Sequence, residues 1–179
     1  MDERVTRAAG LIRTVLDFPK PGVKFRDITP LLSDVQAFRG VIDVMAEHAP
    51  AGLDAVCGVE SRGFIFGTPL ALRLGVGFVP IRKPGKLPGT VVEESFDLEY
   101  GSTTLAMHID ALQAGDRVLV VDDLLATGGT LQASKRLVER LGASVAQMQV
   151  VLELAGLPGR TLLDAAGVND LYSLIRVDE

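Results

Sequence analysis

The chain has 179 residues, enough for one domain with a sizeable core, and hydrophobic residues make up 47% of it. This composition is typical of a packed globular protein and excludes a small stapled scaffold or a disordered chain. Lys and Arg number 18 against 23 Asp and Glu, so the net charge is −5, and non-specific binding to nucleic acid or anionic lipid is not expected. Any anion that binds must meet a local basic site.

The cysteine and histidine content limits which disulfides and metal sites the protein can form, and it bears on the cellular compartment. The single cysteine, Cys57, excludes an internal disulfide, and with only His48 and His108 there are too few ligands for a structural zinc site. The first residues are charged with no apolar run behind them, so no signal peptide is expected. Residues 63–81 are apolar, but their prolines, glycines and Arg73 favour a helix and a strand over a membrane span. We expect a cytoplasmic protein.

Hydrophobic periodicity predicts alternating helices and strands. In the first half we expect a helix from Val5 to Leu16, followed by a loop at 25–27. A capping box of Ser33 and Gln36 then opens a second helix, which ends near His48. After it we expect a strand at 55–59, a helix at 70–74 and a strand at 77–81. In the second half we expect a strand at 118–121, a helix at 131–141, a strand at 145–154 and a shorter strand at 171–177. This order predicts an α/β fold with a central, mostly parallel sheet flanked by helices, in a single domain over 1–179.

A proline- and glycine-rich segment interrupts this alternation. Residues 82–89 read Arg-Lys-Pro-Gly-Lys-Leu-Pro-Gly, which predicts a mobile loop. Apolar residues then alternate through Phe96, Leu98 and Tyr100, and again over 105–109 after a turn at Gly101. We therefore expect residues 82–104 to form a flexible lid and hairpin.

The most informative stretch runs from a buried strand into a helix. Residues 120–130 read Val-Val-Asp-Asp-Leu-Leu-Ala-Thr-Gly-Gly-Thr. Gly128 and Gly129 allow successive N–H groups to converge, the helix adds its positive end, and Thr127 and Thr130 offer hydroxyls, so we predict a phosphate site. It is not a Walker loop, because no Gly-Lys-Ser/Thr follows.

Asp122 and Asp123 precede this loop, and two carboxylates beside a phosphate would repel it unless a cationic or hydroxyl-bearing group lies between. A ribose 5-phosphate supplies such an arrangement, with the vicinal diol on the carboxylates and Mg²⁺ nearby. The alternative, that the pair are helix-capping or solvated acids and the glycines only a turn, stays open for these residues taken alone.

In its full context, the segment 120–130 resembles the phosphoribosyl-pyrophosphate signature of the type I phosphoribosyltransferases. Three further segments narrow the resemblance to family members that act on adenine. They are Phe-Pro-Lys-Pro-Gly-Val-Lys-Phe-Arg-Asp-Ile-Thr-Pro at 18–30, Glu-Ser-Arg-Gly-Phe-Ile-Phe-Gly at 60–67, and Ile-Arg-Lys-Pro-Gly-Lys-Leu-Pro-Gly at 81–89 with Leu-Glu-Tyr-Gly at 98–101. The match spans nearly the whole chain and is weakest at 90–94 and after Arg160.

The resemblance implies transfer of the 5-phosphoribosyl group of phosphoribosyl pyrophosphate to N9 of adenine, giving AMP and pyrophosphate, with Mg²⁺ as cofactor and a homodimer as the assembly. It implies a small base-binding hood formed by N-terminal and C-terminal segments. The implied 5-phosphate site comprises Ala126, Thr127, Gly128, Gly129 and Thr130. Asp122 and Asp123 would recognise the ribose hydroxyls and orient Mg²⁺ directly or through water, with the ion held through pyrophosphate and ribose and no residue assigned as its direct ligand.

The remaining implied roles concern pyrophosphate, base and lid. The pyrophosphate site would comprise Glu60, Ser61, Arg62, Lys83 and Lys86, with Arg82 among the basic groups and a non-proline cis peptide between Glu60 and Ser61. Phe25 and Leu154 would lie on the two faces of adenine, with the Arg26 backbone at its edge. The catalytic residues would be Glu99, Arg62 and Tyr100, with Glu99 a candidate acid or base near the purine and the lid bringing Tyr100 over the site.

Blander interpretations stay open beside these. A lone Arg or Lys in a loop is usually a solvated charge, and Phe25 and Leu154 can be plain core residues. Two other functions share the phosphate loop, namely a phosphoribosyltransferase for a 6-oxopurine and a non-catalytic regulator that binds phosphoribosyl pyrophosphate. The regulator predicts an appended nucleic-acid-binding region or a basic face, which neither the length nor the charge of this chain suggests.

Overall fold

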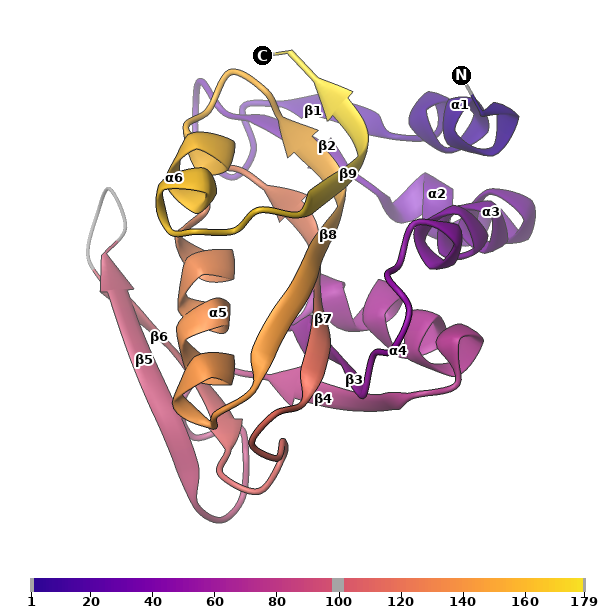
Figure 1. The fold of residues 1–179 in the computed structure, drawn as a ribbon. Helices are drawn as coiled ribbons and strands as arrows, with labels where there is room; N and C mark the ends of the chain where they lie inside the picture. Colours follow the sequence, from indigo (N-terminus) through magenta and orange to yellow (C-terminus); the bar gives the residue numbers. More distant parts are fainter. Residues whose placement is uncertain (1, 98–101, 179) are drawn as a thin grey trace.

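A five-stranded parallel sheet forms the centre of the computed structural model, which describes residues 2–97 and 102–178 (Figure 1). The strand order is β4-β3-β7-β8-β9, and each neighbouring pair is parallel. The strands are β3 (Ala55–Val59), β4 (Gly77–Ile81), β7 (Arg117–Leu125), β8 (Ser144–Leu154) and β9 (Leu171–Val177). The predicted α/β class with a mostly parallel central sheet is confirmed.

Two helical layers cover the sheet (Figure 1). One contains α1 (Glu3–Gly10), α2 (Thr29–Ser33), α3 (Val35–Glu47) and α4 (Arg62–Leu74), and the other α5 (Gly129–Arg140) and α6 (Gly159–Ala165). Successive side chains of a strand point to opposite faces of the sheet, so each strand contributes to both cores. Val56 packs on the side of α3 and α4, and its neighbour Cys57 packs on the side of α5. Both cores include residues of the central strands, so each helical layer packs directly against the sheet.

The N-terminal predictions need three corrections. The helix expected to reach Leu16 ends at Gly10, and β1 (Arg13–Leu16) pairs antiparallel with β2 (Lys24–Asp27), where a loop was expected. Leu16 is 67% exposed, so the apolar periodicity there does not mark a buried helix face. Nor does Ser33 cap the next helix, because it ends α2 and the Asp34 carboxylate accepts hydrogen bonds from the Gln36 and Ala37 amides.

The second half follows the predicted order with shifted boundaries. Strand β7 continues through Leu125 rather than ending at Val121, so the Asp122–Asp123 pair lies within the strand. Helix α6, which the sequence did not predict, follows Pro158.

The predicted hairpin is present in its described part. Strands β5 (Val91–Asp97) and β6 (Ser102–His108) pair antiparallel from Val91–His108 to Asp97–Ser102. The first strand therefore begins five residues before Phe96. The hairpin lies beside α5, where Arg136 Nη1 is 3.1 Å from Glu94 Oε1 (Figure 1). Glu99 and Tyr100, the two candidate residues expected on this lid, lie outside the described residues.

Candidate active site

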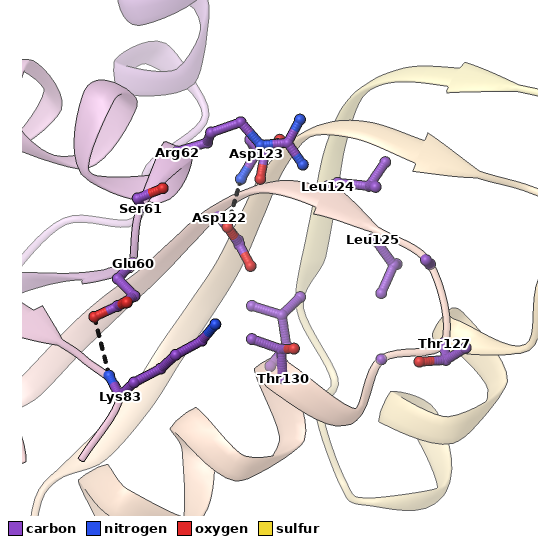
Figure 2. Close-up of a pocket in the computed structure, with 13 residues that line it drawn as sticks. Glu60, Ser61, Arg62, Lys83, Asp122, Asp123, Leu124, Leu125, Thr127 and Thr130 are labelled. Carbon is purple, nitrogen blue, oxygen red and sulfur yellow. Dashed lines mark hydrogen bonds and ion pairs between the residues drawn. The ribbon is translucent and has the colours of Figure 1, made fainter. Parts of the chain in front are cut away.

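A polar cavity of about 390 Å³ opens at the carboxyl ends of β3 and β7 (Figure 2). This is the edge of a parallel sheet at which ligands characteristically bind. The cavity is lined by Glu60, Ser61, Arg62, Lys83, Asp122, Asp123, Leu124, Leu125, Ala126, Thr127, Gly128, Thr130 and Leu131. The structure thus brings together ten residues that the sequence predicted to share a site, namely Glu60, Ser61, Arg62, Lys83, Asp122, Asp123, Ala126, Thr127, Gly128 and Thr130.

The loop 126–128 joins β7 to α5 with a fixed backbone geometry. Gly128 has a φ of 87°, and a Cβ on it would lie 2.8 Å from the Gly159 carbonyl oxygen. Any side chain would therefore meet both backbone strain and a steric clash. Helix α5 begins at the next residue, so its free N–H groups and the positive end of its dipole lie at this cavity. Gly129 itself is not among the lining residues.

Asp122 and Asp123 are buried carboxyls, 8% and 6% exposed. The Asp122 Oδ1 atom accepts a hydrogen bond from the Asp123 amide at 2.8 Å, and Asp123 Oδ2 lies 3.0 Å from Arg62 Nε. Burial raises the pKa of Asp122 well above its usual value, and the neighbouring Asp123 charge raises it further. Burial also raises the pKa of Asp123, although Arg62 opposes that shift. They are therefore neither helix caps nor solvated acids.

The segment that begins α4 approaches β7 closely. The peptide bond between Glu60 and Ser61 is cis, as predicted. At Gly63, a Cβ would lie 2.9 Å from the Val121 carbonyl oxygen, so glycine there permits the contact that brings Arg62 beside Asp123.

Glu60 joins this segment to the start of the 82–89 loop. Its Oε2 atom accepts hydrogen bonds from Arg82 Nε at 3.1 Å and from the Lys83 amide at 3.0 Å. The Lys83 side chain points into the cavity (Figure 2). Lys86 is exposed and does not line it, and the Lys86 carbonyl instead accepts from the Arg82 guanidinium at 3.0 Å. The structure therefore separates two lysines that the sequence grouped together.

A second, more apolar cavity of about 470 Å³ adjoins the first. Its lining is Gly22, Val23, Lys24, Phe25, Arg26, Arg62, Leu124, Leu154 and Leu157. Arg62 and Leu124 line both cavities, and the Arg62 guanidinium carbon lies 5.5 Å from the centre of the Phe25 ring. The predicted Phe25, Arg26 and Leu154 are thus brought together in one concave site.

Sequence reasoning missed several lining residues, among them Leu124 and Leu157. Leu124 follows the aspartate pair directly in a strand whose end faces the site, so strand alternation could have found it. Leu157 reaches the cavity through a turn in which its amide donates to the Leu154 carbonyl at 3.1 Å, and no sequence signal marks that turn as functional.

Three other reactive side chains lie away from both cavities. His48 stacks on Tyr172 at 4.1 Å, and a His108 ring nitrogen lies 2.7 Å from the Pro88 carbonyl oxygen. Burial raises the pKa of the Cys57 thiol to about 12, so it is a core residue rather than a nucleophile. These placements match the sequence interpretation.

No cluster of three His, Cys, Asp or Glu side chains that could hold a metal occurs in residues 2–97 and 102–178. Within the same part of the chain, no helix combines the length and apolarity needed to cross a membrane.

The chain is similar to proteins of named activity. Residues 33–164 match the family model described as the phosphoribosyl transferase domain. An adenine phosphoribosyltransferase of Cutibacterium acnes is 50% identical over 177 residues, covering 99% of this chain and 100% of that protein. The solved adenine phosphoribosyltransferase of Thermoanaerobacter pseudethanolicus is 49% identical with a TM-score of 0.92, covering 97% of this chain and 99% of the other. That of Saccharomyces cerevisiae, complexed with an imino-altritol bisphosphate and adenine, is 36% identical with a TM-score of 0.91, covering 98% and 100%.

Proposed function

The chain belongs to the phosphoribosyltransferase family, and from that premise we propose that it transfers the 5-phosphoribosyl group of phosphoribosyl pyrophosphate to N9 of adenine, forming AMP and pyrophosphate. The single observation that carries the proposal is the pair of adjoining cavities that share Arg62 and Leu124. One is polar and lies at a helix N-terminus, and the other presents apolar surface and an aromatic ring. A sugar phosphate and a flat base can therefore bind side by side, with the bond to be formed at the shared wall.

The polar cavity accommodates the phosphoribosyl group. We assign the 5-phosphate to residues 126–130, where the N–H groups at the start of α5 and the hydroxyls of Thr127 and Thr130 are available. Asp122 and Asp123 follow one another at the end of β7 and present carboxylate oxygens to the ribose hydroxyls.

The opposite side of the same cavity accommodates pyrophosphate. Substitution at the anomeric carbon requires that the departing negative charge be neutralised and that water be excluded. Arg62 and the Lys83 ammonium supply positive charge, and the Glu60–Ser61 segment lines the same side. Lys86, which stands outside the cavity in this structure, contributes only if the 82–89 loop moves.

Mg²⁺ is the cofactor we propose, and the donor set present fits it. Mg²⁺ in nucleotide enzymes is held by one or two carboxylates plus substrate phosphates rather than by an all-protein cage. The described residues offer that arrangement, because Asp122 has a carboxylate facing the cavity (Figure 2) and no three of their His, Cys, Asp or Glu side chains are grouped so that they could hold a metal by themselves. Asp122 and Asp123 would hold the metal together with ribose and pyrophosphate oxygens, and the ion would supply further neutralisation of the leaving group.

The apolar cavity accommodates adenine between Phe25 and Leu154, with the backbone at Arg26 along its edge. A 6-amino group donates where a 6-oxo group accepts. A pocket matched to adenine therefore leaves an unpaired polar atom with hypoxanthine, at a cost of about 1–3 kcal/mol. The similarity to adenine phosphoribosyltransferases at 49–50% identity favours adenine over the 6-oxopurine alternative.

The remaining assignments complete the proposal. Residues 1–179 form one domain in which 82–104 act as a lid that excludes water and brings Glu99, the candidate acid or base, and Tyr100 to the site. The enzyme acts as a homodimer in the cytoplasm, with adenine, phosphoribosyl pyrophosphate, AMP and pyrophosphate as its ligands. It binds neither nucleic acid nor membrane.

A purine panel tests the function directly. The protein is incubated with phosphoribosyl pyrophosphate and Mg²⁺ plus adenine, hypoxanthine or guanine, and nucleotide formation is followed. We expect kcat/KM for adenine to exceed that for hypoxanthine by about 10-fold or more, the equivalent of the unpaired polar atom. Comparable kcat/KM values for adenine and hypoxanthine would instead favour the alternative function, a phosphoribosyltransferase for a 6-oxopurine. Tight binding of phosphoribosyl pyrophosphate with no nucleotide formed from any purine would promote the regulator.

A further inference from the structure

One ion pair outside the two cavities, between the buried Glu153 and the partly exposed Arg160, has no role in the reaction as assigned so far. Glu153, 2% exposed, lies near the end of β8 beside Leu154. Its two carboxylate oxygens accept hydrogen bonds from Arg160, from Nε at 3.0 Å and from Nη2 at 2.6 Å. This two-pronged geometry matches the planar guanidinium to the carboxylate and fixes the orientation of both groups.

Arg160 uses its remaining donors on the neighbouring strand. Its Nη1 donates to the Leu171 carbonyl at 3.3 Å, and its Nη2 also donates to Ser173 Oγ at 3.1 Å. The guanidinium therefore ties the first turn of α6 to both β8 and β9. The hydrogen bonds from Arg160 lower the pKa of the Glu153 carboxyl, so the pair stays ionised.

The short segment held by this pair contacts both cavities. On one side, Leu157 lines the apolar cavity together with Leu154. On the other side, a Cβ at Gly159 would collide with the Ala126 carbonyl oxygen, and one at Gly128 would lie 2.8 Å from the Gly159 carbonyl oxygen. Segment 157–159 thus lies against the loop 126–128 at one end and against the base site at the other.

We propose that Arg160 is a positioning residue that sets the distance between the base site and the 5-phosphate site. The inference rests on the proposed function, in which a single nucleotide spans these two sites. Arg160 lines neither cavity, so it acts only through segment 157–159. Its loss lets that segment shift, and a displacement of about 1 Å in such an element can cost about 100-fold in the reaction it supports.

The pyrophosphate side provides an internal reference. Arg62 lies at the start of α4, Lys83 in the 82–89 loop and Glu60 between β3 and α4, and among the described residues Arg160 makes no hydrogen bond or ion pair to any of these segments. A local shift of segment 157–159 should therefore weaken AMP binding and leave pyrophosphate binding unchanged. General destabilisation would affect both.

Arg176→Met is the matched control for Arg160→Met. Arg176 Nε lies 3.4 Å from the same Glu153 Oε2, but its side chain is 57% exposed and lies on β9, away from α6. Both variants remove one cation beside the same carboxylate, and only Arg160→Met releases α6. Arg160→Lys retains the positive charge but loses the paired hydrogen bonds of the guanidinium to the Glu153 carboxylate.

The experiment measures the Kd of AMP and of pyrophosphate with Mg²⁺ by calorimetry, together with Tm and the adenine KM. We expect Arg160→Met to weaken AMP by about 10- to 100-fold and to raise the adenine KM more than it lowers kcat, with pyrophosphate unchanged. Arg160→Lys should fall between it and wild type, and Arg176→Met should stay within about twofold of wild type, as an exposed ion pair does.

Equal losses for AMP and pyrophosphate, or equal effects of the two arginine variants, would overturn the proposal. If Arg160→Met does not fold, Glu153→Gln takes its place and must show the same split between AMP and pyrophosphate. AMP binding by the wild-type protein distinguishes a failure of the positioning role from a failure of the proposed function. A wild type that does not bind AMP refutes the proposed function, whereas an Arg160 variant with normal AMP affinity, beside a wild type that binds AMP, refutes only the positioning role.

Discussion

The two cavities are built in different ways. The polar cavity draws most of its lining from residues 60–62 and 122–131, two short segments at adjacent strand ends, and its shape depends on backbone geometry at Gly63 and Gly128. The apolar cavity is lined by the continuous stretch 22–26, which carries the Phe25 ring, and by single side chains from other elements, namely Arg62, Leu124, Leu154 and Leu157. The shape of the polar cavity therefore depends mainly on backbone geometry, whereas the shape of the apolar cavity depends mainly on the size of its side chains.

This difference bears on how each site tolerates change. A backbone site has no alternative arrangement, because one added Cβ meets a neighbouring carbonyl. A side-chain site can repack around a smaller or differently shaped residue at modest cost. Substitutions in the polar cavity should therefore cause larger losses than those in the apolar cavity, and the predictions below test that order.

The largest effect is expected for Gly128→Ala. The new Cβ would meet the Gly159 carbonyl oxygen and force the loop 126–128 to move, so AMP affinity should fall by about 100-fold or more, as misplacement of a binding element does. Gly167→Ala is the matched control, because Gly167 also has a positive φ, 76°, but a Cβ there has nothing within 4 Å. The measurement is the Kd of AMP for both variants and for the wild type, determined by titration. Equal affinities would show that the loop does not depend on close packing at Gly128.

The next effect is expected for the double variant Asp122→Asn, Asp123→Asn. A hydrogen bond to a charged group contributes about 1.5–3 kcal/mol, so the loss of the charges should lower the kcat/KM of the double variant by about 10- to 100-fold. Stability should fall less, because neutral amides relieve the burial of two adjacent acids. The measurement pairs kcat/KM with Tm, and AMP is compared with its 2′- and 3′-deoxy analogues on the wild type. Deoxy analogues that bind as tightly as AMP would contradict the ribose assignment.

The same contrast explains what the sequence could and could not predict. The strand-to-helix junction at 118–130 is continuous in sequence, so its glycines, threonines and acids could be interpreted together, and the structure places most of them around one cavity. Leu157 and the Glu153–Arg160 pair act through contacts between α6, β8 and β9, which no local pattern encodes. The β1–β2 hairpin was missed because its strands have only four residues each and none of these residues is buried, so the strands carry no clear periodicity.

A smaller effect is expected at the lysines of the 82–89 loop, which the sequence treated alike and the structure separates. Lys83→Met removes a cation from the polar cavity, whereas Lys86→Met removes one from outside it. We expect the first to raise the KM for phosphoribosyl pyrophosphate by about 10-fold, the scale of one charged hydrogen bond, and the second to change it by less than about twofold. Steady-state kinetics at fixed adenine test this. A large effect of Lys86→Met would indicate that the loop closes far enough to bring it in.

The smallest effect is expected in the apolar cavity, at Phe25. Phe25→Leu keeps apolar bulk but loses the ring that packs edge-on to Phe18 at 5.1 Å and lies beneath the Arg62 guanidinium. Aromatic pairing contributes about 0.5–1.5 kcal/mol beyond area burial, so the adenine KM should rise by about 2- to 12-fold. The KM for phosphoribosyl pyrophosphate should stay constant, since no backbone geometry changes. Leu16→Ala, on the partner strand and 67% exposed, is the control and should leave both values unchanged. A Phe25→Leu loss as large as that of Gly128→Ala would show that the base site is as rigid as the phosphate site, and the contrast between backbone and side-chain sites would fail.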